Sequence, residues 1–218
     1  FYSDEWDDMT HSETWSLRRL APFEVRQRLG GAFAGAAALA RLRAEPGHPR
    51  AEVRVEAGFD VAAERVAAGD WGGLNELLGA TEGPARAGVL DVVAARVADV
   101  TPFVASLRDG LTDGHDGVRA RAGAILARRA LRRGELDEVR RLLAGDDRSI
   151  LPAVLQEIVA AARDGFDPAP LFGRLAELRG HADEAIRRPA WWMLVDRARA
   201  PGATDALPLF LADLEADD

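Results

Sequence analysis

The chain has 218 residues, of which 48% are hydrophobic and 29% charged, and its formal net charge is −8. This balance is typical of a folded globular protein, and the negative charge argues against nucleic-acid binding by the surface as a whole. All 28 basic residues are arginine and cysteine is absent, which argues against a P-loop, a catalytic Schiff-base lysine, a disulfide or a thiolate metal site. The all-arginine usage also indicates a GC-rich, bacterial-like genome.

The amino-terminal part divides into two segments. Residues 1–16 form an acidic, aromatic arm with five carboxylates and no arginine. Residues 17–80 are expected to be an irregular helical cap, with a helix over 17–43 in which Gly30, Gly31 and Gly35 would let another helix approach closely. Only Val53 to Val55 hints at the alternation of a strand.

Residues 81–218 carry helix start and stop signals at regular intervals. Residues suited to the helix amino terminus precede the apolar segments, and glycines suited to the carboxyl terminus follow them. The starts are Thr101, Ser149, Asp167 and Asp183; the ends are Gly79, Gly110, Gly134, Gly145, Gly165 and Gly180. The predicted helices are Asp116–Arg133, Glu135–Ala144, Ser149–Asp164, Pro168–Arg179, Asp183–Arg199 and Thr204–Glu215. The fold class is therefore predicted to be all-α.

These helices repeat along the chain. Apolar segments ending in leucine occur at intervals of 33, 32, 35 and 36 residues, at Leu78, Leu111, Leu143, Leu178 and Leu214. That spacing is typical of a repeated helix–turn–helix unit whose copies stack, because one hairpin cannot bury its apolar face alone. We therefore predict one continuous right-handed α-solenoid of stacked hairpins over residues 81–218. An irregular helical bundle with accidental spacing is the alternative.

The segment from His115 to Leu126 resembles the first helix of a HEAT repeat, with an acidic turn, then Val118-Arg119, then small residues and a leucine. Residues 185–190 are a weaker match to the same pattern. The resemblance implies an armadillo/HEAT-type helical repeat fold over about residues 81–216. It further implies a general role in protein interaction rather than a specific activity.

No catalytic or metal-binding pattern stands out. The four histidines are scattered, no nucleophile elbow is present, and no carboxylate pair is singled out for acid–base work. His115 and His181 fall at turns between repeats, where they would cap or contact solvent. We predict no cofactor and no enzyme activity. No apolar run reaches the roughly 20 residues of a membrane span and no leader peptide is present, so we expect a cytoplasmic protein that is not bound to a membrane.

Nine arginines lie between Arg119 and Arg148, against five acids. The planar guanidinium suits carboxylates and phosphates alike, so one interpretation is a basic patch that receives an acidic protein or peptide. The other is that these arginines pair with acids across the stack. The candidate contact residues, the last three of them on a concave surface formed by second helices, are Arg119, Arg121, Arg140, Arg141 and Arg174. The arm could fold over this patch or engage a neighbouring copy, giving self-association.

Trp191 and Trp192, followed by Asp196, suggest another class of function. Some HEAT-like proteins are DNA glycosylases that hold an alkylated base between tryptophans and an aspartate, so these three residues are the alternative nucleic-acid site. Adjacent residues on a helix point about 100° apart, and at least one tryptophan is therefore expected in the core. The main prediction remains a non-catalytic scaffold that binds a protein or peptide.

Overall fold

The structure is a computed structural model that describes residues 51–81 and 83–199. Within these residues every regular element is a helix, so the all-α prediction is confirmed for them. The predicted arm, the helix over 17–43 with its three glycines, and the helix Thr204–Glu215 lie outside the described residues. The chain divides into two compact units, Phe1–Val92 and Val93–Asp218, and each is described by itself.

In the first unit, helix α4 (Ala51–Ala67) is followed by α5 (Trp71–Ala80) and by the beginning of α6 (Gly83–Arg96). The hint of a strand at residues 53–55 was wrong, because they lie inside α4. Gly69 reverses the chain between α4 and α5 with a φ of 68°, a conformation that favours glycine. Asp70 then caps α5 by accepting a hydrogen bond of 2.8 Å from the Gly73 N–H.

Helices α4 and α6 cross with almost no space between their backbones. A Cβ atom added to Gly58 would lie 2.0 Å from the Ala85 carbonyl oxygen, and one added to Gly88 would lie 1.9 Å from the Val55 carbonyl oxygen. Two glycines thus allow the contact from both sides, since no larger residue fits at either position.

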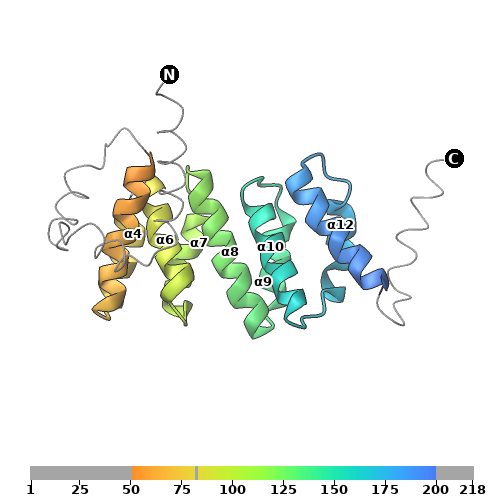
Figure 1. The fold of residues 1–218 in the computed structure, drawn as a ribbon, viewed down its shortest axis with the longest axis horizontal. Coiled ribbons are helices and arrows are strands. Elements are labelled where there is room, and N and C mark those ends of the chain that lie inside the picture. Colours follow the sequence, from red (N-terminus) through yellow and green to blue (C-terminus); the bar gives the residue numbers. More distant parts are fainter. Residues whose placement is uncertain (1–50, 82, 200–218) are drawn as a thin grey trace, which may run out of the picture. The chain divides into compact units, whose positions relative to one another are not determined.

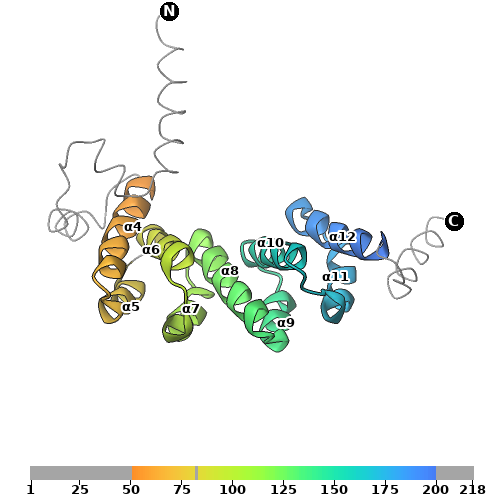
Figure 2. The same cartoon turned by 60° about the horizontal axis from the view of Figure 1, so that its bottom comes forward.

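The second unit consists of short helical segments that pack on their neighbours in order. Helix α8 contacts α7, α9 and α10, and α12 contacts α10 and α11. Helices α8, α10 and α12 therefore lie side by side in one row, with α7, α9 and α11 along one side of it (Figures 1 and 2). The elements are η1 (Thr101–Phe103), α7 (Val104–Gly110), α8 (Asp116–Arg133), α9 (Leu136–Ala144), α10 (Ile150–Arg163), η2 (Ala169–Leu171), α11 (Phe172–Leu178) and α12 (Glu184–Arg199).

The apolar stripes predicted for α8 and α10 form the core of this unit. On α8, Val118, Ala122 and Leu126 are fully buried, and Ile125 is almost so. On α10, the residues Leu151, Val154, Leu155 and Ile158 are all fully buried. Apolar residues at spacings of three and four thus face the neighbouring helices, as expected from helical periodicity.

The helix ends agree with the sequence signals in part. Gly134 ends α8 in the left-handed conformation, at φ 68°, as predicted. Gly79 and Gly110 mark helix ends but do not follow them, because Gly79 is the next-to-last residue of α5 and Gly110 the last residue of α7. The side chain that caps α10 belongs to Asp147 rather than Ser149: its Oδ1 accepts from the Ile150 N–H at 3.1 Å.

Candidate functional site

The Val-Arg pair of α8 has a structural role. Val118 is fully buried, whereas Arg119 turns back over the start of its own helix and donates to the Asp113 carbonyl oxygen at 2.8 Å. Its Nη2 pairs with Asp116 at 2.6 Å, and its Nε reaches Asp147, before α10, at 2.8 Å. Arg119 thus joins two successive parallel helices of the row.

The weaker sequence match in α12 repeats this arrangement. Ile186 is fully buried, and Arg187 donates from Nη1 to the carbonyl oxygens of His181 and Ala182 at 2.8 and 3.1 Å. His181 also caps the turn, since its Nδ1 accepts from the Asp183 N–H at 2.9 Å. The pattern of a buried aliphatic residue followed by a turn-binding arginine therefore occurs at both sites of resemblance.

Asp147 is the acceptor that links Arg119 to the start of α10. Burial acts to raise the pKa of Asp147, but hydrogen bonds from the Ser149 hydroxyl and from the N–H groups of Ser149 and Ile150, with the charge of Arg119, hold that pKa below its usual value. The carboxylate is therefore kept ionised, and it serves as both a helix cap and an ion-pair partner.

Further arginine contacts join neighbouring segments, in agreement with the interpretation that these arginines pair with acids across the stack, although the sequence did not assign their partners. Arg128 on α8 donates two hydrogen bonds to the Glu157 carboxylate on α10, at 2.8 and 2.7 Å. Arg108 on α7 donates at 3.1 Å to Glu138 on α9, a carboxylate buried between helices. The signal that could have found them is an acid about one repeat downstream, 30 residues after Arg108 and 29 after Arg128.

The other predicted contact arginines also bind within the chain. Arg121 donates to the Gly117 carbonyl at 3.0 Å, and Arg141 pairs with Glu138. Arg140 pairs with Asp137 at 2.9 Å and reaches the Pro170 carbonyl at 3.3 Å. Arg174 donates to the Leu143 and Gly145 carbonyls, at 2.8 and 3.2 Å, at the end of α9. The structure therefore spreads the five predicted residues over α8, α9 and α11 and gives each an intrachain partner.

The surface of α12 differs, because its tryptophans are exposed. The exposed fraction is 41% for Trp191 and 52% for Trp192. The expectation that at least one of them packs in the core was wrong. Ile186, Ala190 and Leu194 occupy the buried face of α12, and the positions directly after Ala190 turn away from it.

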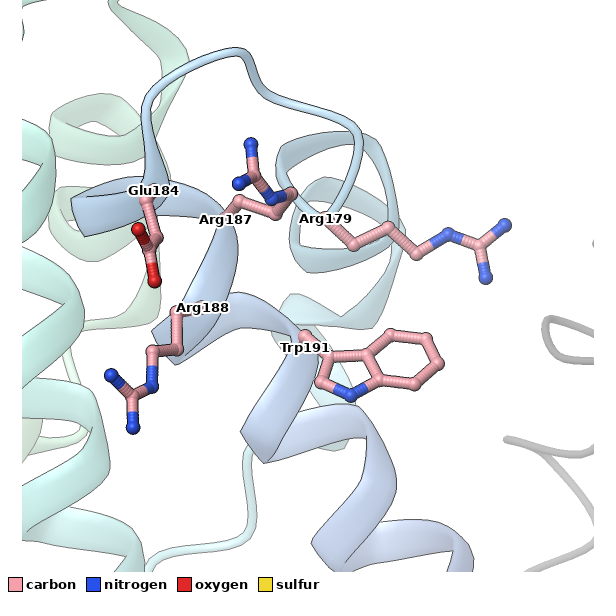
Figure 3. A pocket seen from close by; sticks show the side chains of 5 residues that line it. All are labelled: Arg179, Glu184, Arg187, Arg188 and Trp191. Carbon is pink, nitrogen blue, oxygen red and sulfur yellow. The ribbon is translucent and has the colours of Figure 1, made fainter.

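A pocket of about 300 Å³ adjoins Trp191. It is lined by Arg179, which follows α11, and by Glu184, Arg187, Arg188 and Trp191 of α12. Figure 3 shows Arg179 and Trp191 extending to the same side, while Glu184 and Arg188 point to another. Within the described residues Arg188 makes no hydrogen bond or ion pair. Arg132, Arg148 and Arg163 share this property, but none of them lines this pocket.

Neither Trp192 nor Asp196 lines the pocket, although both are exposed on the same helix. The three residues of the alternative nucleic-acid site therefore share α12 but not one cavity. We take the pocket residues together with Trp192 as the candidate functional site and name it the α12 surface.

Comparisons with known proteins give no relative for this chain. No family model, no curated protein and no solved structure matches it. Its function must therefore be argued from the α12 surface and its surroundings.

No group of three or more histidine, aspartate or glutamate side chains in the part of the chain that the structure describes is arranged to hold a metal ion. No helix there is long and apolar enough to cross a bilayer.

Proposed function

We propose that this chain is a non-catalytic scaffold that binds a protein or peptide. The observation that carries the proposal is the exposure of Trp191 and Trp192, the first of which lines a pocket together with three arginines. Tryptophan and arginine are the residues most enriched at the energetic centres of protein interfaces. Two exposed tryptophans also leave apolar surface in contact with water. Burying that surface against a partner would be favourable.

We further propose that the scaffold is a right-handed solenoid of HEAT-like hairpins over residues 81–218. The row of α8, α10 and α12 supports this, since each helix contacts the next. The equivalent positions of Val118-Arg119 and Ile186-Arg187 also support it, as do the contacts that recur about one repeat apart. In such a stack the partner surface is set by side chains that the neighbouring repeats do not use.

Nucleic-acid binding, for example by an alkylated-base DNA glycosylase, is the second candidate. It is favoured by the exposure of Trp191, Trp192 and Asp196, because bases stack on aromatic side chains. Two features weigh against it. The net charge is −8, and only Trp191 of the three lines the pocket, whereas a flipped base needs one cavity that both stacks it and reads its edge.

A peptide array and a DNA titration separate the two. The purified chain and its Trp191→Ala/Trp192→Ala variant are applied to immobilised peptides that vary in charge and aromatic content. We expect the wild type to retain acidic, aromatic peptides and the variant to lose them. In parallel, duplex, single-stranded and alkylated DNA are titrated at low and physiological salt. DNA binding that falls steeply with salt and depends on the tryptophans, without peptide retention, would overturn the scaffold.

A further inference from the structure

We propose that the α12 surface binds an acidic peptide that carries aromatic residues, and that residues 1–16 of a second copy of this chain are such a peptide. The inference rests on the proposed binding function and specifies its ligand. It predicts self-association through exchange of the arm between copies.

The charge of the pocket selects an anionic ligand. Its lining contains three arginines and one glutamate, and Arg188 has no partner among the described residues. Arg187 uses only its Nη1 for the turn carbonyls, so its Nη2 remains available to an incoming carboxylate. Guanidinium groups bind carboxylates through paired, charge-assisted hydrogen bonds. The Glu184 carboxylate would accept a hydrogen bond from a backbone N–H group of the ligand.

The tryptophans add a preference for an aromatic or apolar side chain. Trp191 forms part of the pocket wall, and Trp192, the next residue of α12, is more than half exposed outside the pocket. Aromatic pairs gain from both burial and ring geometry. A ligand that alternates acids and aromatic residues would therefore contact the arginines and the tryptophans together.

Residues 1–16 have this composition. They contain five carboxylates, no arginine, and the aromatic residues Phe1, Tyr2, Trp6 and Trp15. Two acids of α9 and α10, Glu138 and Glu157, already pair with arginines of the same unit. Residues 205–218 hold five acids as well, but only one aromatic residue, Phe210. The arm is therefore the better match, and residues 205–218 provide a control with equal charge.

The first test titrates a fluorescent peptide of residues 1–16 with the full chain and follows its anisotropy. The acceptor carries amides in place of the five arm carboxylates, so that its own arm does not compete. We expect Arg188→Ala to weaken binding about fivefold and Trp192→Ala about tenfold or more. Arg132→Ala and Trp71→Ala are matched controls that remove an exposed arginine and an exposed tryptophan elsewhere; both should stay within about twofold of the unsubstituted acceptor.

Two peptides test the selectivity. A version of residues 1–16 with amides in place of its carboxylates should lose most of its affinity, and the peptide of residues 205–218 should bind more weakly than the arm. Equal binding of all three, or no binding of the arm peptide, would overturn the inference. If the array still retained other acidic peptides through Trp191 and Trp192, the scaffold function would stand without this ligand.

The second test concerns self-association. We expect sedimentation velocity to show association of the wild type that increases with concentration. Both the Arg188→Ala/Trp192→Ala variant and the variant with a neutralised arm should stay monomeric. Mixing the two should restore a dimer, because one supplies the arm and the other the α12 surface. Monomeric wild type, or a mixture that does not associate, would overturn the exchange between copies.

Discussion

Arg119 and Arg128 of α8 have the same chemistry as Arg188 of α12 but different surroundings. On α8, Arg119 and Arg128 donate hydrogen bonds to acids and carbonyl oxygens of neighbouring segments. On α12, Arg188 has no partner among the described residues and lies at a pocket edged by exposed tryptophan. A cluster of arginines in a sequence therefore identifies a binding surface only after the intrachain acceptors have been assigned.

The contrast is sharpest within α12 itself, between its buried and exposed faces. Leu194→Ala should lower the free energy of unfolding by about 3 kcal/mol, because Leu194 is fully buried and the smaller side chain leaves a cavity. Trp192→Ala should change it by less than about 0.5 kcal/mol. Urea unfolding followed by circular dichroism measures both. A Trp192 variant as damaged as the Leu194 variant would assign the tryptophan to the fold.

The paired region should lose stability when one arginine is truncated. Arg128→Ala removes both hydrogen bonds to Glu157 and leaves a carboxylate that is 14% exposed without its partner. The expected loss is about 2 kcal/mol, below that of a fully buried pair because Arg128 is 38% exposed. Arg132→Ala, at an exposed position on the same helix, serves as the control and should be close to wild type in thermal unfolding. Equal losses of stability in the Arg128 and Arg132 variants would show that the ion pair with Glu157 does not contribute.

Asp147 should make the paired region sensitive to acid. Its Oδ1 caps α10 and its Oδ2 accepts from Arg119, so Asp147→Ala should cost about 1 kcal/mol at neutral pH. Asp147→Asn keeps a capping oxygen and should cost less. Because the folded-state pKa is lowered, the contribution is complete above the unfolded value of about 3.9 and is lost as pH falls through the folded value. Unfolding measured from pH 7 to pH 3 should show wild type and Asp147→Ala converging at the acid end; a constant gap would contradict this account.

The smallest expected difference in the free energy of unfolding is between alanine variants of two adjacent arginines of α12. Arg187→Ala should cost about 0.5 kcal/mol, since Arg187 binds two turn carbonyls. Arg188→Ala should leave the free energy of unfolding unchanged and act only on peptide binding. Chemical denaturation of the two variants side by side, with enough repeats to resolve the difference, checks the order. The reverse order would place Arg188 in the fold and weaken the α12 surface as a binding site.

Much of the fold follows from local sequence signals. The limits of α8 could be predicted at Asp116 and Arg133, because Asp116 favours the positive end of the helix dipole and Gly134 adopts the left-handed conformation that ends it. The segment over residues 168–179 was less predictable. Its first turn is the 3₁₀ helix η2 before α11, and a proline start does not distinguish these two helix types.

The ion pairs between helices and the α12 surface were harder to predict, each for a physical reason. First, the partners of Arg119 and Arg128 lie 28 and 29 residues away, so they depend on the register between helices rather than on a local pattern. Second, Ile186 and Ala190 compete with Trp191 and Val195 for the buried face of α12, and both sets have helical spacing. Packing against α10 and α11 decides which side faces the core, and a single helix does not contain that information.

The crossing of α4 and α6 has a consequence for finding relatives of this chain. Gly58 and Gly88 stand thirty residues apart, and each meets the backbone three residues before the other, at Ala85 and Val55. Any missense change in either codon adds a Cβ where a carbonyl oxygen leaves no space, whereas surface codons can drift freely. The two glycines at this fixed interval are thus a compact signature that divergent sequences should keep after overall similarity has faded.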